Sequence, residues 1–334
     1  MNFPRRRFLH LAATAAAVPA AGRIARAQAY PSRPITMVVP VSAGGAMDTL
    51  ARIVAEGMRA SLGQPIIVEN VTGAEGRIGV GRVASASPDG YTLSYAAFAT
   101  HVINGAVYAL PYDVVEDFES VALISSTPWL IAVKNGLAAN DLAVNDLKGL
   151  IAWLKANPDK ASAGTVGAGS PSHLGGVLLQ NMTGTRFQFV PYRGNAPAMQ
   201  DLVGGQIDMM IVDPVTSLPQ LRAGRIKVVA VMAKSRTATA PDIPTVDEAG
   251  SPGLYIAPWQ AIWAPKGTPR DIIAKLNQAV VNALADPAVR QRLADQSYEI
   301  GPREEQTPEY LRAFHKAEIE KWWPIIKAAN IKAE

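Results

Sequence analysis

Short apolar runs alternate with amphipathic helical stretches along most of the chain. From Ile35 the order is the run ITMVVPV, a helical stretch from about Asp48, the run PIIVEN, a glycine-rich turn into RIGVGRVASAS, and the run YTLSYAA. Strands that alternate with helices predict mainly parallel sheets with helices on both faces, which is the α/β fold class.

A second series of the same kind begins near Trp129. Helical stretches start near Asn145, Ser172 and Ala196, between the apolar runs WLIAVK, KASAGTV, FQFVPY, MMIVD and VVAVMA. This block contains enough elements for a complete α/β unit of its own.

The segments after Gly250 are too few for a third domain. They are the apolar segment YIAPWQAIWAP and two helical stretches, residues 269–285 and 308–329. We therefore predict that the tail returns to the first unit. The first lobe would consist of residues 30–128 and 252–334 and the second of residues 129–251, with two crossings of the chain and a ligand cleft between the lobes.

The positive charge of the chain is concentrated at its N-terminus. The formal charge is +4, but five of the 32 basic residues precede position 28, where no acidic residue occurs. Without these five, 27 basic residues remain against 28 acidic ones, a net charge of −1. The charge therefore gives no support for binding nucleic acid.

The same segment is typical of an export signal. A basic start is followed by the apolar stretch LAATAAAVPAAG and by small residues around Ala27 and Ala29, where cleavage is expected. PRRRFLH, with Arg5 and Arg6, resembles the twin-arginine motif, and the general secretory route is the alternative. We predict a signal peptide of residues 1–29, cleavage after Ala29, and a soluble periplasmic protein.

Few catalytic or cofactor-binding patterns are present. The chain has no cysteine, so it has no thiolate nucleophile and no thiolate metal site, and its four histidines lack metal-ligand spacing. The glycines near Gly44 have neither the lysine of a phosphate-binding loop nor the order of a dinucleotide site. We predict no cofactor, no metal and no enzymatic activity.

Two small-residue loops lie between a strand and a helix. In the first, residues 42–48, paired glycines and a helix N-terminus favour an anion such as a carboxylate, while the alternative is a tight turn with Asp48 as the helix cap. The second, residues 164–174, repeats this design with hydroxyl groups. A serine hydrolase that uses Ser170 or Ser172 with His173 is a further alternative, although GAGSP is not the usual nucleophile motif.

Five segments together resemble the Bug family, the extracytoplasmic solute receptors of tripartite tricarboxylate transporters. They are YPSRPITMVVPVSAGGAMDTLAR, ENVTGAEGRIGVGRVASASPDGYTL, GAGSPSHL, VPYRGNAPAMQDLVGGQIDMM and IWAPKGTP. The resemblance implies a periplasmic binding protein of the type II, Venus-flytrap kind that closes on a small organic carboxylate. It also implies docking on large and small membrane subunits of a transporter; a sensor subunit for a membrane kinase is the other alternative.

The resemblance also implies the ligand-binding residues. Those expected around the cleft are Ser42, Ala43, Gly44, Gly45, Met47, Asp48, Ala97, Thr100, His101, Gly167, Gly169, Ser170, Ser172, His173, Arg193, Gly194 and Asp213.

Two residues depart from the family pattern. Met47 stands where threonine is common, which suggests a more apolar first-lobe wall and a ligand of hydrocarbon or aromatic character. Glu75 stands where glycine is usual and adds a negative charge to a turn.

Overall fold

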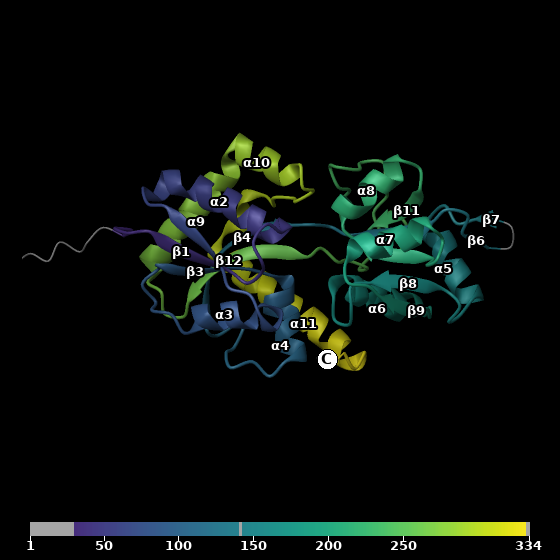
Figure 1. Ribbon diagram of the computed structural model, residues 1–334, viewed down its shortest axis with the longest axis horizontal. Coiled ribbons are helices and arrows are strands. Elements are labelled where there is room, and N and C mark those ends of the chain that lie inside the picture. Colours follow the sequence, from purple (N-terminus) through teal and green to yellow (C-terminus); the bar gives the residue numbers. More distant parts are fainter. Residues whose placement is uncertain (1–29, 140–141, 332–334) are drawn as a thin grey trace, which may run out of the picture.

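Two five-stranded sheets, each with helices on both faces, form two lobes (Figure 1). The computed structural model describes residues 30–139 and 142–331, so the predicted signal peptide lies outside the described part of the chain. The first lobe is built on the sheet β2-β1-β3-β12-β4 and the second on the sheet β11-β5-β10-β8-β9. None of the helices that the structure describes is both long and apolar enough to span a membrane.

The strands of each sheet come from different parts of the chain. The first-lobe strands are β1 (Ile35–Val39), β2 (Ile66–Asn70), β3 (Thr92–Ala97), β4 (Phe118–Ser126) and β12 (Trp259–Pro265). The second-lobe strands are β5 (Leu130–Lys134), β8 (Ser162–Thr165), β9 (Gln188–Pro191), β10 (Met209–Val212) and β11 (Ile226–Val231), while β6 (Ala138–Ala139) and β7 (Leu142–Ala143) form a separate hairpin.

One strand in each sheet runs against the other four. In the first lobe this strand is β12, which is antiparallel to both β3 and β4. In the second lobe it is β5, which is antiparallel to both β10 and β11. Each is the first strand after the chain crosses from the other lobe, so it enters the sheet from the opposite end. The prediction of mainly parallel sheets in an α/β fold is confirmed.

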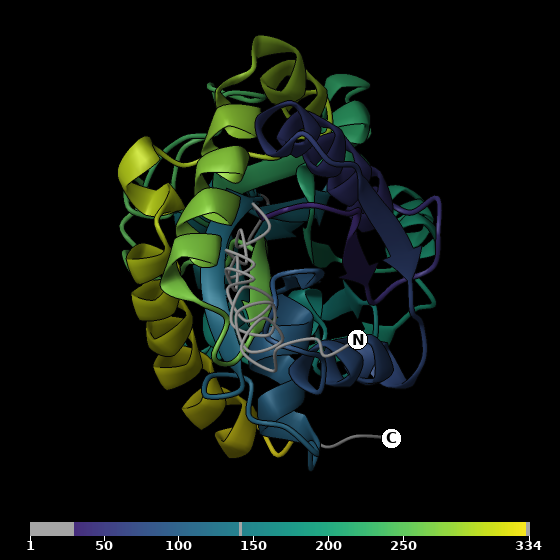
Figure 2. The ribbon, with the colours of Figure 1, turned by 90° about the vertical axis from the view of Figure 1, so that its left-hand side faces the viewer.

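Alternate residues of the first-lobe strands pack against different helical layers. In β1, Met37 and Val39 face the core formed with α2 (Ala46–Leu62), α9 (Arg270–Ala285) and α10 (Pro287–Ala294). Val38 faces the opposite core, formed with α3 (Arg77–Ala84) and α11 (Pro308–Ala328). Viewed from this lobe, the helices lie on both sides of the sheet (Figure 2).

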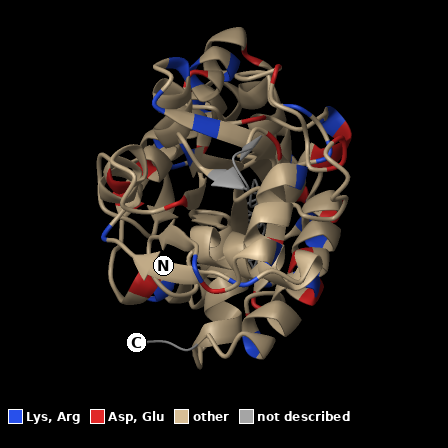
Figure 3. Ribbon diagram, turned by 90° about the vertical axis from the view of Figure 1, so that its right-hand side faces the viewer, with Lys and Arg blue, Asp and Glu red and all other residues tan. Residues whose placement is uncertain are grey.

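The second lobe has the same layered construction. Ile131 and Val133 of β5 pack in the core that includes α5 (Leu147–Ala156) and α6 (Pro171–Thr183), whereas Ala132 packs with α7 (Asn195–Val203). The remaining helix, α8 (Pro214–Arg222), covers the sheet near Leu130. Basic and acidic residues are interspersed around this lobe (Figure 3).

The two crossing segments contact each other at the hinge. Thr127 N–H donates to the carbonyl of Pro258 over 2.9 Å, and Trp129 N–H donates to that of Ile256 over 3.1 Å. From α11, Lys321 Nζ donates to the carbonyl of Tyr255 over 2.7 Å. These hydrogen bonds hold the two crossing segments together, and the two segments form the hinge between the lobes.

Candidate functional site

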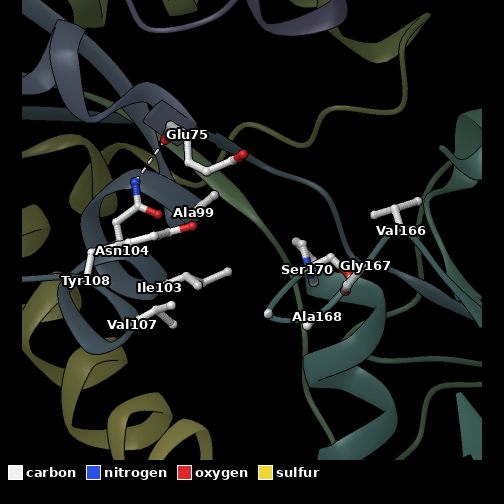
Figure 4. A pocket seen from close by; sticks show the side chains of 12 residues that line it. Glu75, Ala99, Ile103, Asn104, Val107, Tyr108, Val166, Gly167, Ala168 and Ser170 are labelled. Atoms are coloured by element: carbon white, nitrogen blue, oxygen red, sulfur yellow. Dashed lines mark hydrogen bonds between the residues drawn. The ribbon is translucent and has the colours of Figure 1, made fainter. Parts of the chain in front are cut away.

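A cavity of about 400 Å³ lies between the two lobes. Its first-lobe wall comes from the turn at Glu75 and from residues 99–108, and its second-lobe wall comes from residues 166–171 (Figure 4). Residues 99–108 follow the carboxyl end of β3, and residues 166–171 follow that of β8. The cavity therefore occupies the position at which open α/β sheets commonly bind ligands.

The second-lobe wall presents backbone N–H groups to the cavity. Gly167 and Gly169 adopt φ angles of 105° and 74°, which turn the chain sharply before α6, and Ser170 is the N-cap of that helix. Among the described residues, the N–H groups of Gly167 and Ala168 in this wall have no acceptor; that of Ser172 has none either, but Ser172 is buried and outside the cavity lining. Free N–H groups at a helix N-terminus favour an anion.

The two serine hydroxyls hold this loop in shape. Ser170 Oγ donates to the carbonyl of Gly167 over 2.7 Å and accepts from His173 N–H. Ser172 Oγ accepts from Val166 N–H over 3.0 Å and lies 2.9 Å from Ser170 Oγ. Because both hydroxyls already have partners, the free donors of the loop are mainly on its backbone.

The ring of His173 also belongs to this loop and not to a catalytic pair. Its Nδ1 accepts from Gly169 N–H over 3.0 Å, which places the proton of a neutral ring on Nε2. Burial lowers the pKa of His173, and Phe189 packs edge-on against the ring. Ser170 meets the backbone of His173 and not its ring, so the serine–histidine pair that a hydrolase requires is not formed.

The first-lobe wall is mostly apolar. The short helices η2 (Ala99–Ile103) and α4 (Asn104–Val107) follow β3. Thr100 Oγ1 fixes the start of η2, because it donates to the carbonyl of Ala97 and accepts from the N–H group of Ala97. The side chains of Ile103, Val107 and Tyr108 line the cavity (Figure 4).

Glu75 projects into the cavity from a left-handed turn. Ala74 and Glu75 have φ angles of 48° and 55°, a conformation that few residues other than glycine adopt. Asn104 is buried, and its Nδ2 donates to the carbonyl of Glu75 over 2.9 Å. This bond fastens the turn to α4, and the Glu75 side chain extends toward the second-lobe loop (Figure 4).

His101 does not line the cavity, contrary to the expectation for residues 97–101. Its side chain is 0% exposed and stacks on Trp263 with 3.9 Å between the ring centroids. Burial, and secondarily the nearby His315, lowers its pKa well below the ordinary value, so the ring is neutral. Within that segment it is Ala99 that reaches the cavity, whereas Thr100 is buried beneath it.

In the first-lobe glycine loop, residues 42–48, residues 42–46 are exposed, but the loop lies outside the set of residues that line the cavity. Gly45, not Asp48, is the N-cap of α2, and among described residues the N–H groups of Gly45, Ala46 and Met47 have no acceptor. The Met47 side chain packs against the first-lobe core, which does not support the predicted role in an apolar cleft wall. The loop thus offers backbone donors and the hydroxyl of the exposed Ser42.

Asp48 stabilises this loop from inside. Its carboxylate is nearly buried and accepts from Arg52 Nε, Asn70 Nδ2 and Gly44 N–H over 2.8–3.0 Å. The bond from Arg52, with those from Gly44 and Asn70, lowers the pKa of Asp48 to about 2 against the opposing effect of burial. Because its oxygens are occupied, Asp48 positions the loop and is not available to a ligand.

The remaining expected contacts are also outside the cavity lining. Asp213 caps α8 by accepting from Thr216 N–H over 2.8 Å, and it accepts from Asn195 Nδ2 over 2.6 Å. Arg193 is exposed, and Gly194 precedes α7 as its N-cap. The structure places these residues at the carboxyl ends of β9 and β10, beside the second-lobe loop in the sheet order.

The sequence-based site omitted most of the first-lobe wall. Asn104, Ile103, Val107 and Tyr108 were not predicted, and Glu75 was noted without a role. Their position after the apolar run YTLSYAA was the available signal, since loops and helices that follow the carboxyl end of a parallel strand face the ligand edge.

Residues 50–331 match the family model described as tripartite tricarboxylate transporter family receptor. This chain belongs to that family. The receptor is 35% identical over 308 residues to protein BugT of Bordetella pertussis, covering 92% of each chain. It is therefore a solute-binding protein of the Bug group and not an enzyme.

Two solved structures of related receptors contain ligands. MatC of Rhodopseudomonas palustris with bound malate is 36% identical, with a TM-score of 0.71, over 89% of this chain and 100% of that chain. Rpa4515 of R. palustris with adipate is 33% identical, with a TM-score of 0.74, over 91% and 100% of the respective chains. Both share the two-lobed fold of the receptor.

Proposed function

We propose that the receptor binds a small organic carboxylate in the cavity between its lobes. The observation that carries this proposal is the pair of free N–H groups at Gly167 and Ala168, in the loop that lines the cavity just before α6. A carboxylate there accepts charge-assisted hydrogen bonds and lies at the positive end of the helix dipole. The malate and adipate bound by MatC and Rpa4515 support the same chemistry.

Binding is coupled to closure of the lobes. The hinge consists of the two hydrogen-bonded crossing segments, and we place the lobe boundaries between residues 128 and 129 and between residues 251 and 252. A ligand that contacts both walls binds the closed form better than the open form and so shifts the population toward it.

The first-lobe glycine loop is the second anion-binding element of this proposal. Gly76 and Gly79 lie against Pro40, so the Glu75 turn adjoins the strand end from which this loop departs. Closure brings the free N–H groups of residues 45–47 toward a ligand already held by the second lobe.

The receptor delivers its ligand to large and small membrane subunits of a tripartite transporter. This partner assignment follows from the family, and the basic, apolar and small-residue stretches of residues 1–29 support export to the periplasm. The closed form presents both lobes in one orientation, which gives the membrane subunits a surface that the open form lacks.

A thermal-shift screen tests the proposed function. The exported protein, purified after expression of the full chain, is heated with mono-, di- and tricarboxylates, aromatic acids and amino acids. A ligand at a hundred times its Kd raises the Tm by roughly 5 °C, because it binds the folded state alone. Saturable stabilisation by an acid that is recovered unchanged is the expected result. A flat response to every acid, or conversion of an acid to product, contradicts the proposal.

A further inference from the structure

Glu75 is the one charged side chain among the residues that line the cavity, all of which belong to the described chain. No Lys, Arg or His of the described residues forms an ion pair with it. The nearby Arg77 instead donates from Nε to the carbonyl of Ala74 and stacks over the ring of Tyr108 at 3.8 Å. Among the described residues, the Glu75 carboxylate therefore has no cationic partner within ion-pair distance.

The fold keeps this carboxylate at the cavity. The left-handed backbone at Ala74 and Glu75 costs free energy, and it is held by the bond from Asn104 and by Gly76 N–H donating to the carbonyl of Gly73 over 3.0 Å. The side chain is exposed and extends from this turn toward the second-lobe loop (Figure 4).

The two walls of the cavity thus carry opposite electrostatic character. The second-lobe wall offers free N–H groups at residues 167 and 168, while the first-lobe wall offers a carboxylate. The two walls also carry hydrocarbon side chains, Ile103 and Val107 on the first lobe and Val166 on the second. This arrangement complements a molecule with an anionic end, an apolar middle and a cationic end.

We propose that the ligand is a small zwitterion whose carboxylate binds the second-lobe loop and whose ammonium group, a few carbons away, binds Glu75. This inference rests on the proposed function, because it assumes that the second-lobe loop holds a carboxylate. A dicarboxylate of equal length would place its second negative charge against Glu75, and the repulsion rises as the closing lobes exclude water.

Matched pairs of ligands test the proposal directly. Succinate is compared with β-alanine, glutarate with γ-aminobutyrate, and adipate with δ-aminovalerate, since each pair differs only by replacement of one carboxylate with an ammonium group. Calorimetry on the exported protein gives the Kd of each compound. For the pair of best-fitting length, we expect the amino acid to bind at least about tenfold more tightly than the diacid.

Two substitutions then isolate the charge of Glu75. Glu75→Gln keeps the size of the side chain and should bring the two affinities within about threefold of each other, whereas Glu75→Lys should reverse the preference. Glu56→Gln removes a charge from an exposed position of α2 that does not line the cavity, and it should leave the preference of the wild type unchanged.

The outcomes separate this inference from the proposed function. If diacids bind the wild type as tightly as the amino acids, or if Glu75→Gln leaves the ratio unchanged, the zwitterion proposal is wrong and the carboxylate function stands. If no acid of either kind binds the wild type or the variants, the proposed function itself fails. Tm values without ligand confirm that each variant is folded.

Discussion

Gly44 and Gly63 flank α2 and share the same backbone requirement. Their φ angles are 85° and 68°, and a Cβ at either position would meet no other atom within 4 Å. Replacement by alanine should therefore cost about 1–2 kcal/mol of stability at each site, from backbone strain alone. Only Gly44→Ala should also weaken ligand binding, because its Cβ would stand beside the free N–H groups of the first-lobe loop.

Urea unfolding and calorimetry on the two variants check this expectation. Gly63→Ala is the matched control, since it lies at the opposite end of the helix. Equal affinities in both variants would show that the first-lobe loop does not contact the ligand.

Asp48 should make the stability of the receptor sensitive to acid. Its pKa is lowered from 3.8 to about 2 in the folded state, so its contribution is complete above about pH 4 and is lost as the pH falls toward 2. Asp48→Asn should reduce the free energy of unfolding by about 1–3 kcal/mol at neutral pH, because donors from Gly44, Arg52 and Asn70 lose a charged acceptor.

Urea unfolding of wild type and variant across this pH range measures the difference. The gap between them should narrow as the pH falls from about 4 to 2. A gap of constant size over that range would mean that the carboxylate does not ionise in this environment.

Residues whose roles depend on neighbouring positions in the sequence were predicted better than residues whose roles depend on long-range contacts. The loop of residues 167–173 could be predicted because its glycines and hydroxyls are consecutive in the sequence. The roles of Glu75 and Asn104 could not, because they depend on a hydrogen bond between residues 29 positions apart. His101 was misplaced for a related reason, since nothing local shows that Trp263 covers it.

Two helices of the receptor begin with similar hydroxyl caps. Ser170 Oγ accepts from His173 N–H at the start of α6, and Thr307 Oγ1 accepts from Tyr310 N–H at the start of α11. Replacement of either cap by alanine should cost about 1 kcal/mol. Ser170→Ala should in addition weaken carboxylate binding several-fold, because Ser170 also orders the loop through Gly167.

The comparison with Thr307→Ala separates stability from binding. Both Tm values should fall by a similar amount, while only the Ser170 variant should show a higher Kd. If Thr307→Ala weakens binding equally, the loss reflects general stability and not the geometry of the loop.

Elements with clear hydrophobic periodicity were predictable, and those with mixed composition were not. The helices α2, α9 and α11 correspond to the predicted stretches, because each has an apolar face and clear end signals. Strand β4 was not predicted: in FESVALISS, Glu119 and Ser120 follow the first residue and two serines end the run, and the segment becomes a strand by pairing with β12, more than 130 residues later.

The two-lobed arrangement of the whole molecule could be predicted from the number of strands and helices in each part of the sequence. The antiparallel direction of β12 and β5 could not be predicted in this way. Direction depends on the side from which the chain re-enters a sheet, which composition does not record. The cavity between the lobes likewise depends on how far apart the hinge holds them.

Ligand binding should draw the lobes together. The chain contains no cysteine, so Glu56→Cys in α2 and Lys155→Cys in α5 provide two unique, exposed positions for a fluorescent donor and acceptor. Energy transfer between them should rise with saturating ligand and return to its starting value on dialysis. Unchanged transfer at full occupancy would contradict closure.

The hinge also bears on how the receptor can be observed without labels. Trp129 lies beside the first crossing segment and Trp259 begins the strand after the second, both are at least nine-tenths buried, and no tryptophan lines the cavity. A colourless ligand therefore cannot quench these indoles by contact. With Trp153, Trp263, Trp322 and Trp323 replaced by phenylalanine, a change in the remaining emission on titration would report movement of the crossing segments, so lobe closure could be followed optically without a label.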